Sequence, residues 1–185
     1  CGGSELIGLA NLPHQRKEKL KRHINSLDAD FILVDLGAGT AYNTLDFFVI
    51  SNEGVIVCNP EPQAKIDAYA FVKNDVYRRL LQNFGRNTIL KDIILKFGNS
   101  GQRATKIRNL IEMLGNHVSE FGDKAQTLVD DFKPKLIMNK VRKKSQLEDA
   151  ERFVYLVREY LSVEMEYLGH IEYDERVVDA CENMR

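Results

Sequence analysis

The chain has 185 residues, of which 44% are hydrophobic and 29% are charged, a balance that is ordinary for one globular domain. The formal net charge of −1 excludes a whole-molecule field that would attract nucleic acid or an anionic membrane, so either partner would need a local basic patch. No apolar run approaches the roughly 20 residues that a membrane-spanning helix needs, and we expect no signal peptide.

Three cysteines, Cys1, Cys58 and Cys181, are scattered along the chain and form no CxxC pair. The sequence therefore predicts neither a zinc site nor a disulfide framework, and it favours a reducing, cytoplasmic setting. The chain starts with Cys1 in place of methionine, and its last expected helix reaches Arg185 without a cap. We therefore expect a piece of a longer protein.

Alternating charged and apolar segments predict the first elements. Residues 14–27 predict a charged helix with a thin apolar stripe, and the apolar run 31–34 predicts a buried parallel strand. Residues 44–51 predict a short helix. The apolar run 54–59 predicts a second buried strand, which ends at Pro60.

A long helix is expected from Gln63, with apolar side chains on one face and basic side chains on the other. The expected apolar face comprises Ile66, Ala70, Tyr77, Leu81 and Phe84, and the expected basic face comprises Lys65, Lys73, Arg78 and Arg79. One more short helix is expected within 85–103. The apolar stripe over 107–121 then fits core packing better than the binding of a partner helix.

The rest of the chain continues the alternation. Residues 135–139 and 165–171 predict the third and fourth strands, with a helix over 147–161 between them and a last helix whose N-cap is Asp174. This order predicts an α/β fold with a mostly parallel sheet flanked by helices, in which ligands bind at the carboxyl ends of the strands. Polar residues follow three expected strands, at 35–37, 59–61 and 139–140.

The stretch after the first expected strand suits an anionic ligand. Asp35 would end a buried strand, where a carboxylate needs a cation or hydrogen-bond donors, and a magnesium ion bound directly or through water is one solution. Gly37 and Gly39 allow backbone N–H groups to approach an anion closely. The alternative is an ordinary strand-to-helix turn, because a single GxG is a weak signal.

Six basic residues surround the third expected strand: Lys133, Lys135, Lys140, Arg142, Lys143 and Lys144. They could steer a polyphosphate or contact a nucleic-acid backbone, but a solvated loop is the more common explanation of such a run. The four histidines lie far apart in the sequence, and no grouping of serine, cysteine and histidine argues for nucleophilic catalysis.

Four segments are more informative together than apart: FILVDLGAGTAYNTLDFF (31–48), GVIVCNPEPQAKIDAYAFVK (54–73), KLIMNKVR (135–142) and YLGHIEYDERVVDA (167–180). Their combination resembles the MinD/ParA group of P-loop ATPases, and within it the flagellar-number regulators of the FlhG (also FleN or YlxH) type. The segments occur in the family's order and cover most of the chain. Residues at about 85–130 match less clearly and are interpreted as a helical insertion in one domain that spans 1–185.

The resemblance implies ATP and magnesium as ligands and gives roles to five residues. Asp35 would be the switch aspartate, which contacts magnesium through a water molecule. Gly37 and Gly39 would lie in the loop that senses the γ-phosphate. Asn139 would read the edge of the adenine, and Asp174 would lie near the base.

Two departures from the family stand out. Glu172 occupies a position where the family often has proline, so no base contact is assigned to it. The family's phosphate-binding loop, a glycine-rich turn that ends in Lys-Ser/Thr, is absent from these residues. In the family this loop follows a strand in the middle of the sheet. We therefore interpret the chain as an incomplete P-loop NTPase-like domain, inactive in ATP hydrolysis alone and left with exposed sheet edges.

The resemblance implies an ATP-dependent dimerising switch that regulates flagellar number or placement, cell division or chromosome positioning. Its implied partners are a second copy in the ATP state and protein regulators; nucleic acid is not expected. Its implied location is cytoplasmic, with peripheral association at the inner membrane through segments outside this chain. The alternative is a non-catalytic interaction module. A metallocentre-assembly or electron-transfer ATPase is a third reading, but Cys58 and Cys181 lack neighbouring cysteines.

Overall fold

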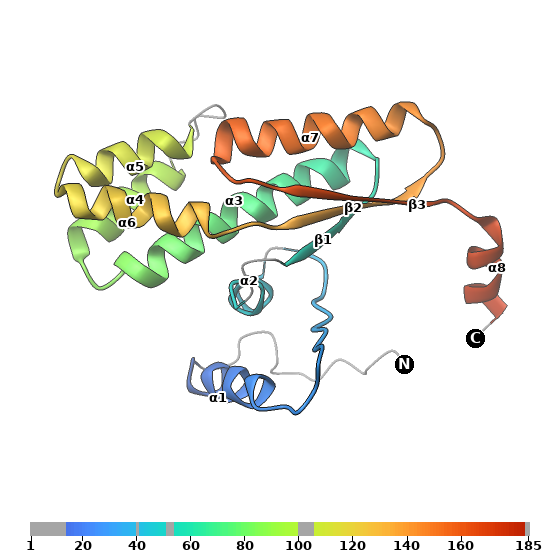
Figure 1. Ribbon diagram of the computed structural model, residues 1–185, viewed down its shortest axis with the longest axis horizontal. Coiled ribbons are helices and arrows are strands. Elements are labelled where there is room, and N and C mark those ends of the chain that lie inside the picture. Colours follow the sequence, from blue (N-terminus) through green and yellow to red (C-terminus); the bar gives the residue numbers. More distant parts are fainter. Residues whose placement is uncertain (1–13, 40, 51–53, 100–105, 184–185) are drawn as a thin grey trace.

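Figure 1 shows a computed structural model of the chain, which describes residues 14–39, 41–50, 54–99 and 106–183. Expectations that concern Cys1 and the glycines of residues 1–8 lie outside the described residues. In chain order the elements are α1 (His14–Asn25), α2 (Tyr42–Phe48), β1 (Val55–Cys58), α3 (Pro62–Phe84), α4 (Thr88–Asn99), α5 (Ile107–Gly115), α6 (Ser119–Asp130), β2 (Lys135–Val141), α7 (Ser145–Leu161), β3 (Glu166–Glu172) and α8 (Glu175–Asn183).

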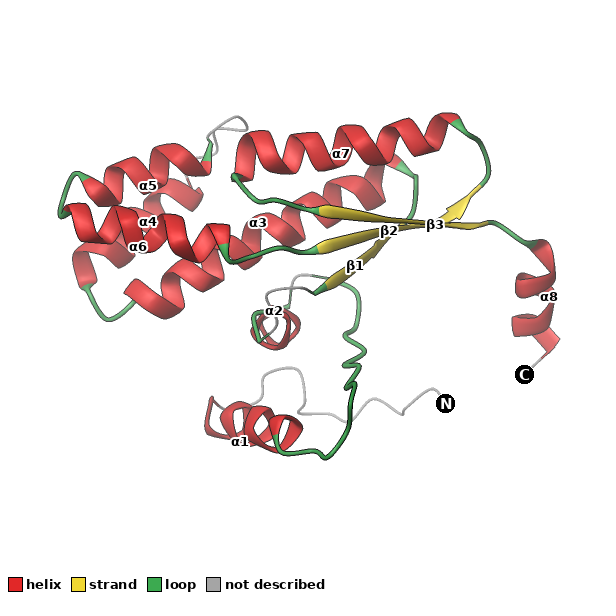
Figure 2. Ribbon diagram, in the orientation of Figure 1, coloured by secondary structure: helices red, strands yellow, loops and turns green. Residues whose placement is uncertain are grey.

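The three strands form one parallel sheet in the order β1-β2-β3 (Figure 2). Lys135 on β2 lies opposite Val55 on one side and Glu166 on the other, so the strands start level with one another. Each strand is joined to the next by a segment that contains a long helix, as parallel pairing requires. The expectation of an α/β fold with a parallel sheet flanked by helices is confirmed at this level.

Helices α3 and α7 pack against the same face of the sheet and against each other. Burial alternates along β1 and β2, where Ile56, Cys58, Leu136 and Met138 are buried and their neighbours are not. Right-handed crossovers explain the shared face, because two successive crossovers in one direction along a sheet bring both helices to the same side. Each fully buried aliphatic side chain contributes about 1.5–3 kcal/mol to folding.

Helices α4, α5 and α6 form a helical module at the end of the molecule opposite the carboxyl ends of the strands (Figures 1 and 2). Ile107, Ile111 and Leu114 of α5 are buried, which confirms core packing for the first part of the predicted stripe, whereas Val118 is 46% exposed. The stripe does not run along one helix, because α5 ends at Gly115 and α6 begins at Ser119.

The prediction of a strand at residues 31–34 is wrong. These residues form no strand and pair with no described strand, and Phe31 and Leu33 are 91% and 96% exposed. A four-residue apolar run has the composition of a buried strand, but it becomes one only where a neighbouring strand and a covering layer are present. Among the described residues, no strand pairs with this run, and all four of its residues are exposed.

The sheet has a free edge and an uncovered face. Lys135 N–H donates to the Gly54 carbonyl oxygen at 2.9 Å, so the peptide groups of Val55 and Val57 point away from β2, toward an edge that carries no described strand. The side chains of both valines are exposed, as is Ile171 near the end of β3. Parallel sheets are normally covered on both faces, so this face is open to a further layer.

The buried face of α3 is rotated from the one predicted. Ile66 is 60% exposed, whereas Arg79, expected on the basic face, is buried with Asp75. The buried side chains instead follow one another four apart, at Ala68, Val72, Val76, Leu80 and Phe84. Arg79 tolerates burial because its guanidinium lies 4.2 Å from the centre of the Phe132 ring and Nε donates to Asp75 Oδ2 at 2.6 Å.

Within the described ranges, every helix is too short or too polar to cross a membrane.

Candidate functional site at the carboxyl edge of the sheet

The carboxyl ends of the three strands and the first turns of α3, α7 and α8 lie at one edge of the sheet (Figure 1). Here an open groove of about 800 Å³ lies between the segments that follow β2 and β3. Its lining comprises Val141, Arg142, Lys143, Lys144, Leu147, His170, Glu172, Tyr173, Asp174, Glu175 and Arg176. The groove therefore occupies the edge at which open α/β sheets bind their ligands.

One wall of the groove is a cation stacked on an aromatic ring. The guanidinium carbon of Arg142 lies 3.5 Å from the centre of the Tyr173 ring. Tyr173 N–H donates to the Val141 carbonyl oxygen at 2.9 Å, which fixes the ring beside the end of β2. The segments after the two strands are thus joined by one backbone hydrogen bond and one stacked pair.

Gln146 fixes the backbone on the β2 side of the groove. Its Oε1 accepts the N–H of Arg142 at 2.8 Å and the N–H of Lys143 at 3.0 Å. The start of a helix leaves backbone N–H groups without partners, and a side-chain acceptor in the first turn of α7 satisfies donors just before it. Lys143 and Lys144 extend from this fixed backbone, and no described residue forms an ion pair with them.

Asp174 lies in the groove and caps α8, as expected. Its Oδ1 accepts the backbone N–H of Arg176 at 2.9 Å, and its Oδ2 lies 2.6 Å from Arg176 Nη2. The hydrogen bond from the Arg176 side chain, assisted by the backbone bond, holds the pKa of this carboxyl below its usual value. Asp174 is therefore ionised at neutral pH, with both oxygens already engaged by its own turn.

Asn139 is half-buried on β2, close to the same edge but outside the lining of the groove. The pairing of β2 with β3 is irregular between Met138 and Val141, and Lys140 adopts a φ of 60°. Asn139 Oδ1 accepts the N–H of Lys140 at 3.0 Å, which stabilises this bulge. The structure thus brings Asn139 and Asp174 to neighbouring strand ends without a contact between them.

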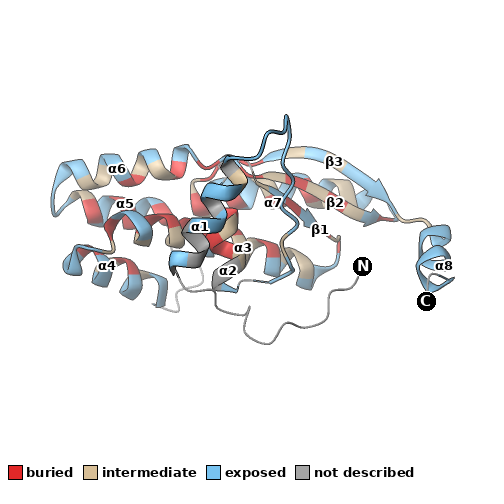
Figure 3. Cartoon of the chain, turned by 90° about the horizontal axis from the view of Figure 1, so that it is seen from below, coloured by how far each residue is buried: buried red, intermediate tan, exposed pale blue. Residues whose placement is uncertain are grey.

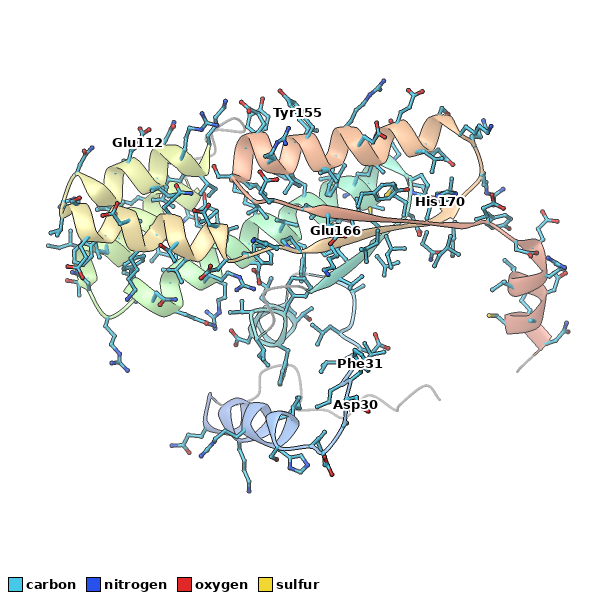
Figure 4. The ribbon with its side chains drawn as sticks, viewed as in Figure 1. Asp30, Phe31, Glu112, Tyr155, Glu166 and His170 are labelled. Atoms are coloured by element: carbon cyan, nitrogen blue, oxygen red, sulfur yellow. The ribbon has the colours of Figure 1, made fainter. Side chains whose placement is uncertain are left out.

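Asp35, Gly37 and Gly39 lie apart from this edge. Their segment is exposed and runs from α1 to α2, below the sheet in Figure 1. Figure 4 shows Phe31, near the start of this segment, well below the sheet, whereas His170 lies on β3 and lines the groove. Gly39 adopts a φ of +103°, which explains glycine there, since other residues rarely adopt it.

The described residues do not build a magnesium site by themselves. Asp35 is a single exposed carboxylate, and the described part of the chain contains no group of three or more histidine, cysteine, aspartate or glutamate side chains arranged to hold a metal ion. Magnesium takes oxygen ligands in a near-octahedral arrangement, commonly from one or two carboxylates with phosphates and water. Asp35 is the one carboxylate that the resemblance assigns to this ion.

Sequence reasoning missed the arrangement of Arg142, Gln146 and Tyr173. The sequence shows that Arg142 follows one strand and Tyr173 the next, but the contact depends on the register that pairs Val141 with Glu172. A run of basic residues at the end of an expected strand was the available signal. It could not show which of them stacks on a ring.

Comparison with protein-family models and with curated proteins finds no match to this sequence. The resemblance to the MinD/ParA group therefore rests on the four sequence segments.

Proposed function

We propose that the chain is the switch and adenine-side portion of an ATP-dependent dimerising switch of the MinD/ParA type. Its cellular task is regulation of flagellar number or placement, with cell division or chromosome positioning as the next candidates, at a cytoplasmic location. The observation that carries the proposal is the occurrence of four family-like segments in the family's order. Support comes from Asn139 and Asp174, which lie at the carboxyl ends of neighbouring parallel strands, where such sheets bind ligands.

In this proposal the two halves of the candidate site act separately. Asn139 and the groove beside Asp174 contact the base, and the exposed segment with Asp35, Gly37 and Gly39 orders when it meets the phosphates of magnesium ATP. The chain contains no lysine-bearing phosphate loop, so the largest source of phosphate-binding energy is missing. The chain alone should therefore bind nucleotides weakly and hydrolyse no ATP.

The test is a titration of the isotope-labelled chain with adenosine and with magnesium ATP, followed by amide chemical shifts. Because the phosphates have no cradle, both ligands should bind with similar, weak affinity, with Kd of about 1 mM or weaker, roughly −4 kcal/mol. Shifts should cluster at Asn139 and Asp174. Asn139→Ala should abolish them, and Asp35→Ala should leave them unchanged.

Three outcomes separate the alternatives. Shifts that cluster at Asn139 and disappear in Asn139→Ala support the adenine-side assignment. Tighter binding of magnesium ATP that depends on Asp35 would mean that these residues assemble a phosphate site without the missing loop. An absence of shifts near Asn139 and Asp174, from a chain shown to be folded, would overturn the assignment.

The second candidate function is a non-catalytic interaction module derived from this fold. It is favoured by the exposed apolar residues of 31–34 and by the free edge of β1, which together offer an uncovered surface to another chain. An overturned adenine assignment together with a stable complex that buries Val57 would favour this function over the switch.

A further inference from the structure

We infer that Arg142 is a positioning residue: by stacking on Tyr173 it ties the turn after β3 to the turn after β2 and holds the candidate base-side residues in place. The inference rests on the proposed function for the identity of the ligand. The positioning itself can be tested without any ligand.

The geometry of the contact between Arg142 and Tyr173 is specific to an arginine. The guanidinium carbon lies 3.5 Å from the ring centre, a distance at which the flat group contacts the ring face. A guanidinium is planar and stacks on aromatic faces, whereas a lysine ammonium is a compact, strongly hydrated charge. Arg142→Lys would keep the charge of the groove and lose most of this stacking.

The backbone on both sides of the stack is fixed. Gln146 Oε1 accepts a hydrogen bond from the N–H of Arg142 at 2.8 Å, and the Val141 carbonyl oxygen accepts one from the N–H of Tyr173 at 2.9 Å. The side chain of Arg142 therefore bridges two backbone segments that are already aligned, so little further ordering is needed when it stacks.

The stack of Arg142 on Tyr173 positions both candidate base-side residues, Asn139 and Asp174. Asp174 directly follows Tyr173 and caps α8 through Arg176 N–H at 2.9 Å. Asn139 lies in the bulge at which the β2–β3 ladder is irregular, so the regular ladder is interrupted just before the strand ends. Contacts beyond the bulge, at Val141, Arg142 and Tyr173, then determine how the two strand ends sit.

Hydrogen exchange of the full chain without ligand tests the positioning. In Arg142→Met and Arg142→Lys the amides of Tyr173, Arg176 and Val177 should exchange about two- to fivefold faster, the factor expected for loss of a cation–π contact at an exposed site. Tyr173→Phe keeps the ring and should leave exchange unchanged. Lys91→Met, at an exposed position of α4 outside the lining of the groove, removes one positive charge elsewhere and serves as the control.

The same variants, titrated with adenosine, test whether the stack of Arg142 on Tyr173 positions Asn139 and Asp174 for binding. Arg142→Met should weaken the shift response of Asn139 and Asp174 severalfold although the chain stays folded, because the contact it loses is worth only about 0.5–1 kcal/mol. Tyr173→Phe should respond as the wild type does. Equal exchange in Arg142→Met and the wild type would overturn the inference. Faster exchange with an unchanged adenosine response would overturn the role toward the base. If adenosine does not bind the wild type, the proposed function fails, and exchange alone still decides whether Arg142 positions the turn.

Discussion

Asp75 is a buried carboxylate whose hydrogen bonding is incomplete. It is fully buried on α3, where one carboxylate oxygen accepts from Arg79 and the other has no hydrogen-bond partner among the described residues. Burial raises the pKa of Asp75 to about 6, and the charge and hydrogen bond of Arg79 oppose the increase only in part. Desolvation thus destabilises the ionised carboxylate by more than its interaction with Arg79 stabilises it.

The raised pKa of Asp75 predicts a pH dependence of stability. Because the folded pKa of about 6 lies above the ordinary aspartate value of 3.8, the folded chain holds a proton that the unfolded chain releases between these values. Stability from this group is therefore fully present below about pH 4, falls as the pH rises to about 6, and is constant above that, with a total change of about 3 kcal/mol. Urea unfolding from pH 4 to 7 should show this fall in the wild type.

Asp75→Asn should remove that part of the pH dependence, because an amide does not titrate in this range. The quantity to compare is the difference in free energy of unfolding between wild type and variant at each pH. Asp92→Asn, at an exposed position on α4, is the control for general effects of removing a carboxylate. Parallel curves for the wild type and Asp75→Asn would contradict the assignment.

At the scale of elements, the close approach of α5 and α6 depends on a pair of glycines. A Cβ built on Gly122 would lie 2.9 Å from the Gly115 Cα, whereas a Cβ on Gly98 in α4 would meet only the Tyr77 ring, at 3.5 Å or more. The first position has backbone against it and cannot yield without moving a helix. The second position has space for a methyl group.

This difference predicts opposite effects of the same substitution. Gly122→Ala should destabilise the chain by about 1–3 kcal/mol, because overpacking forces α5 and α6 apart. Gly98→Ala should stabilise it by up to about 1 kcal/mol, since alanine is the better helix former. Urea midpoints of the two variants and the wild type test both statements, and a loss of stability in Gly98→Ala equal to that in Gly122→Ala would refute the packing argument.

Element-scale packing also predicts how α2 is held. Asp46 is buried and its Oδ1 accepts from Arg78 of α3 at 2.6 Å, and the Phe48 ring lies edge-on to Phe71, with centres 4.8 Å apart. Asp46→Ala should cost about 1–3 kcal/mol of stability, because it removes a charge-assisted hydrogen bond and leaves its donors poorly satisfied. Exchange of α2 amides should rise more than exchange of α7 amides; equal increases would show that α2 is not held locally.

At the scale of the whole molecule, the sequence predicted the features that depend on local residue patterns. It did not predict burial, strand pairing or side-chain stacking that depends on residues far along the chain. Three of the four expected strands and the order of strands and helices are present, because apolar runs and helical periodicity are local. The sequence of α3 contains more than one apolar stripe, and the choice that buries Val72 and exposes Ile66 depends on which surfaces it meets. The expected strand at 31–34 and the stack of Arg142 on Tyr173 likewise depend on partners far along the chain.

The molecule as a whole is covered unevenly. The core lies between the sheet and α3 and α7 and continues into the helical module, while Figure 3 shows α8 and the segment before α2 almost entirely exposed. The free edge of β1 borders the uncovered face, and none of its four residues is charged or is proline, the usual means by which edge strands resist pairing.

An unprotected edge beside an apolar face predicts self-association of the purified chain. Sedimentation velocity should show a species distribution that shifts to larger particles as protein concentration rises, since both backbone pairing and apolar burial favour contact between copies. Val57→Lys should reduce this association severalfold: the Val57 side chain is 59% exposed, so a lysine there stays hydrated and places a charge at the edge. Met113→Lys, at an exposed position of α5 in the helical module, should leave association unchanged. A wild-type chain that stays monomeric over the whole concentration range, or an equal effect of the two lysines, would show that this edge is not where copies meet.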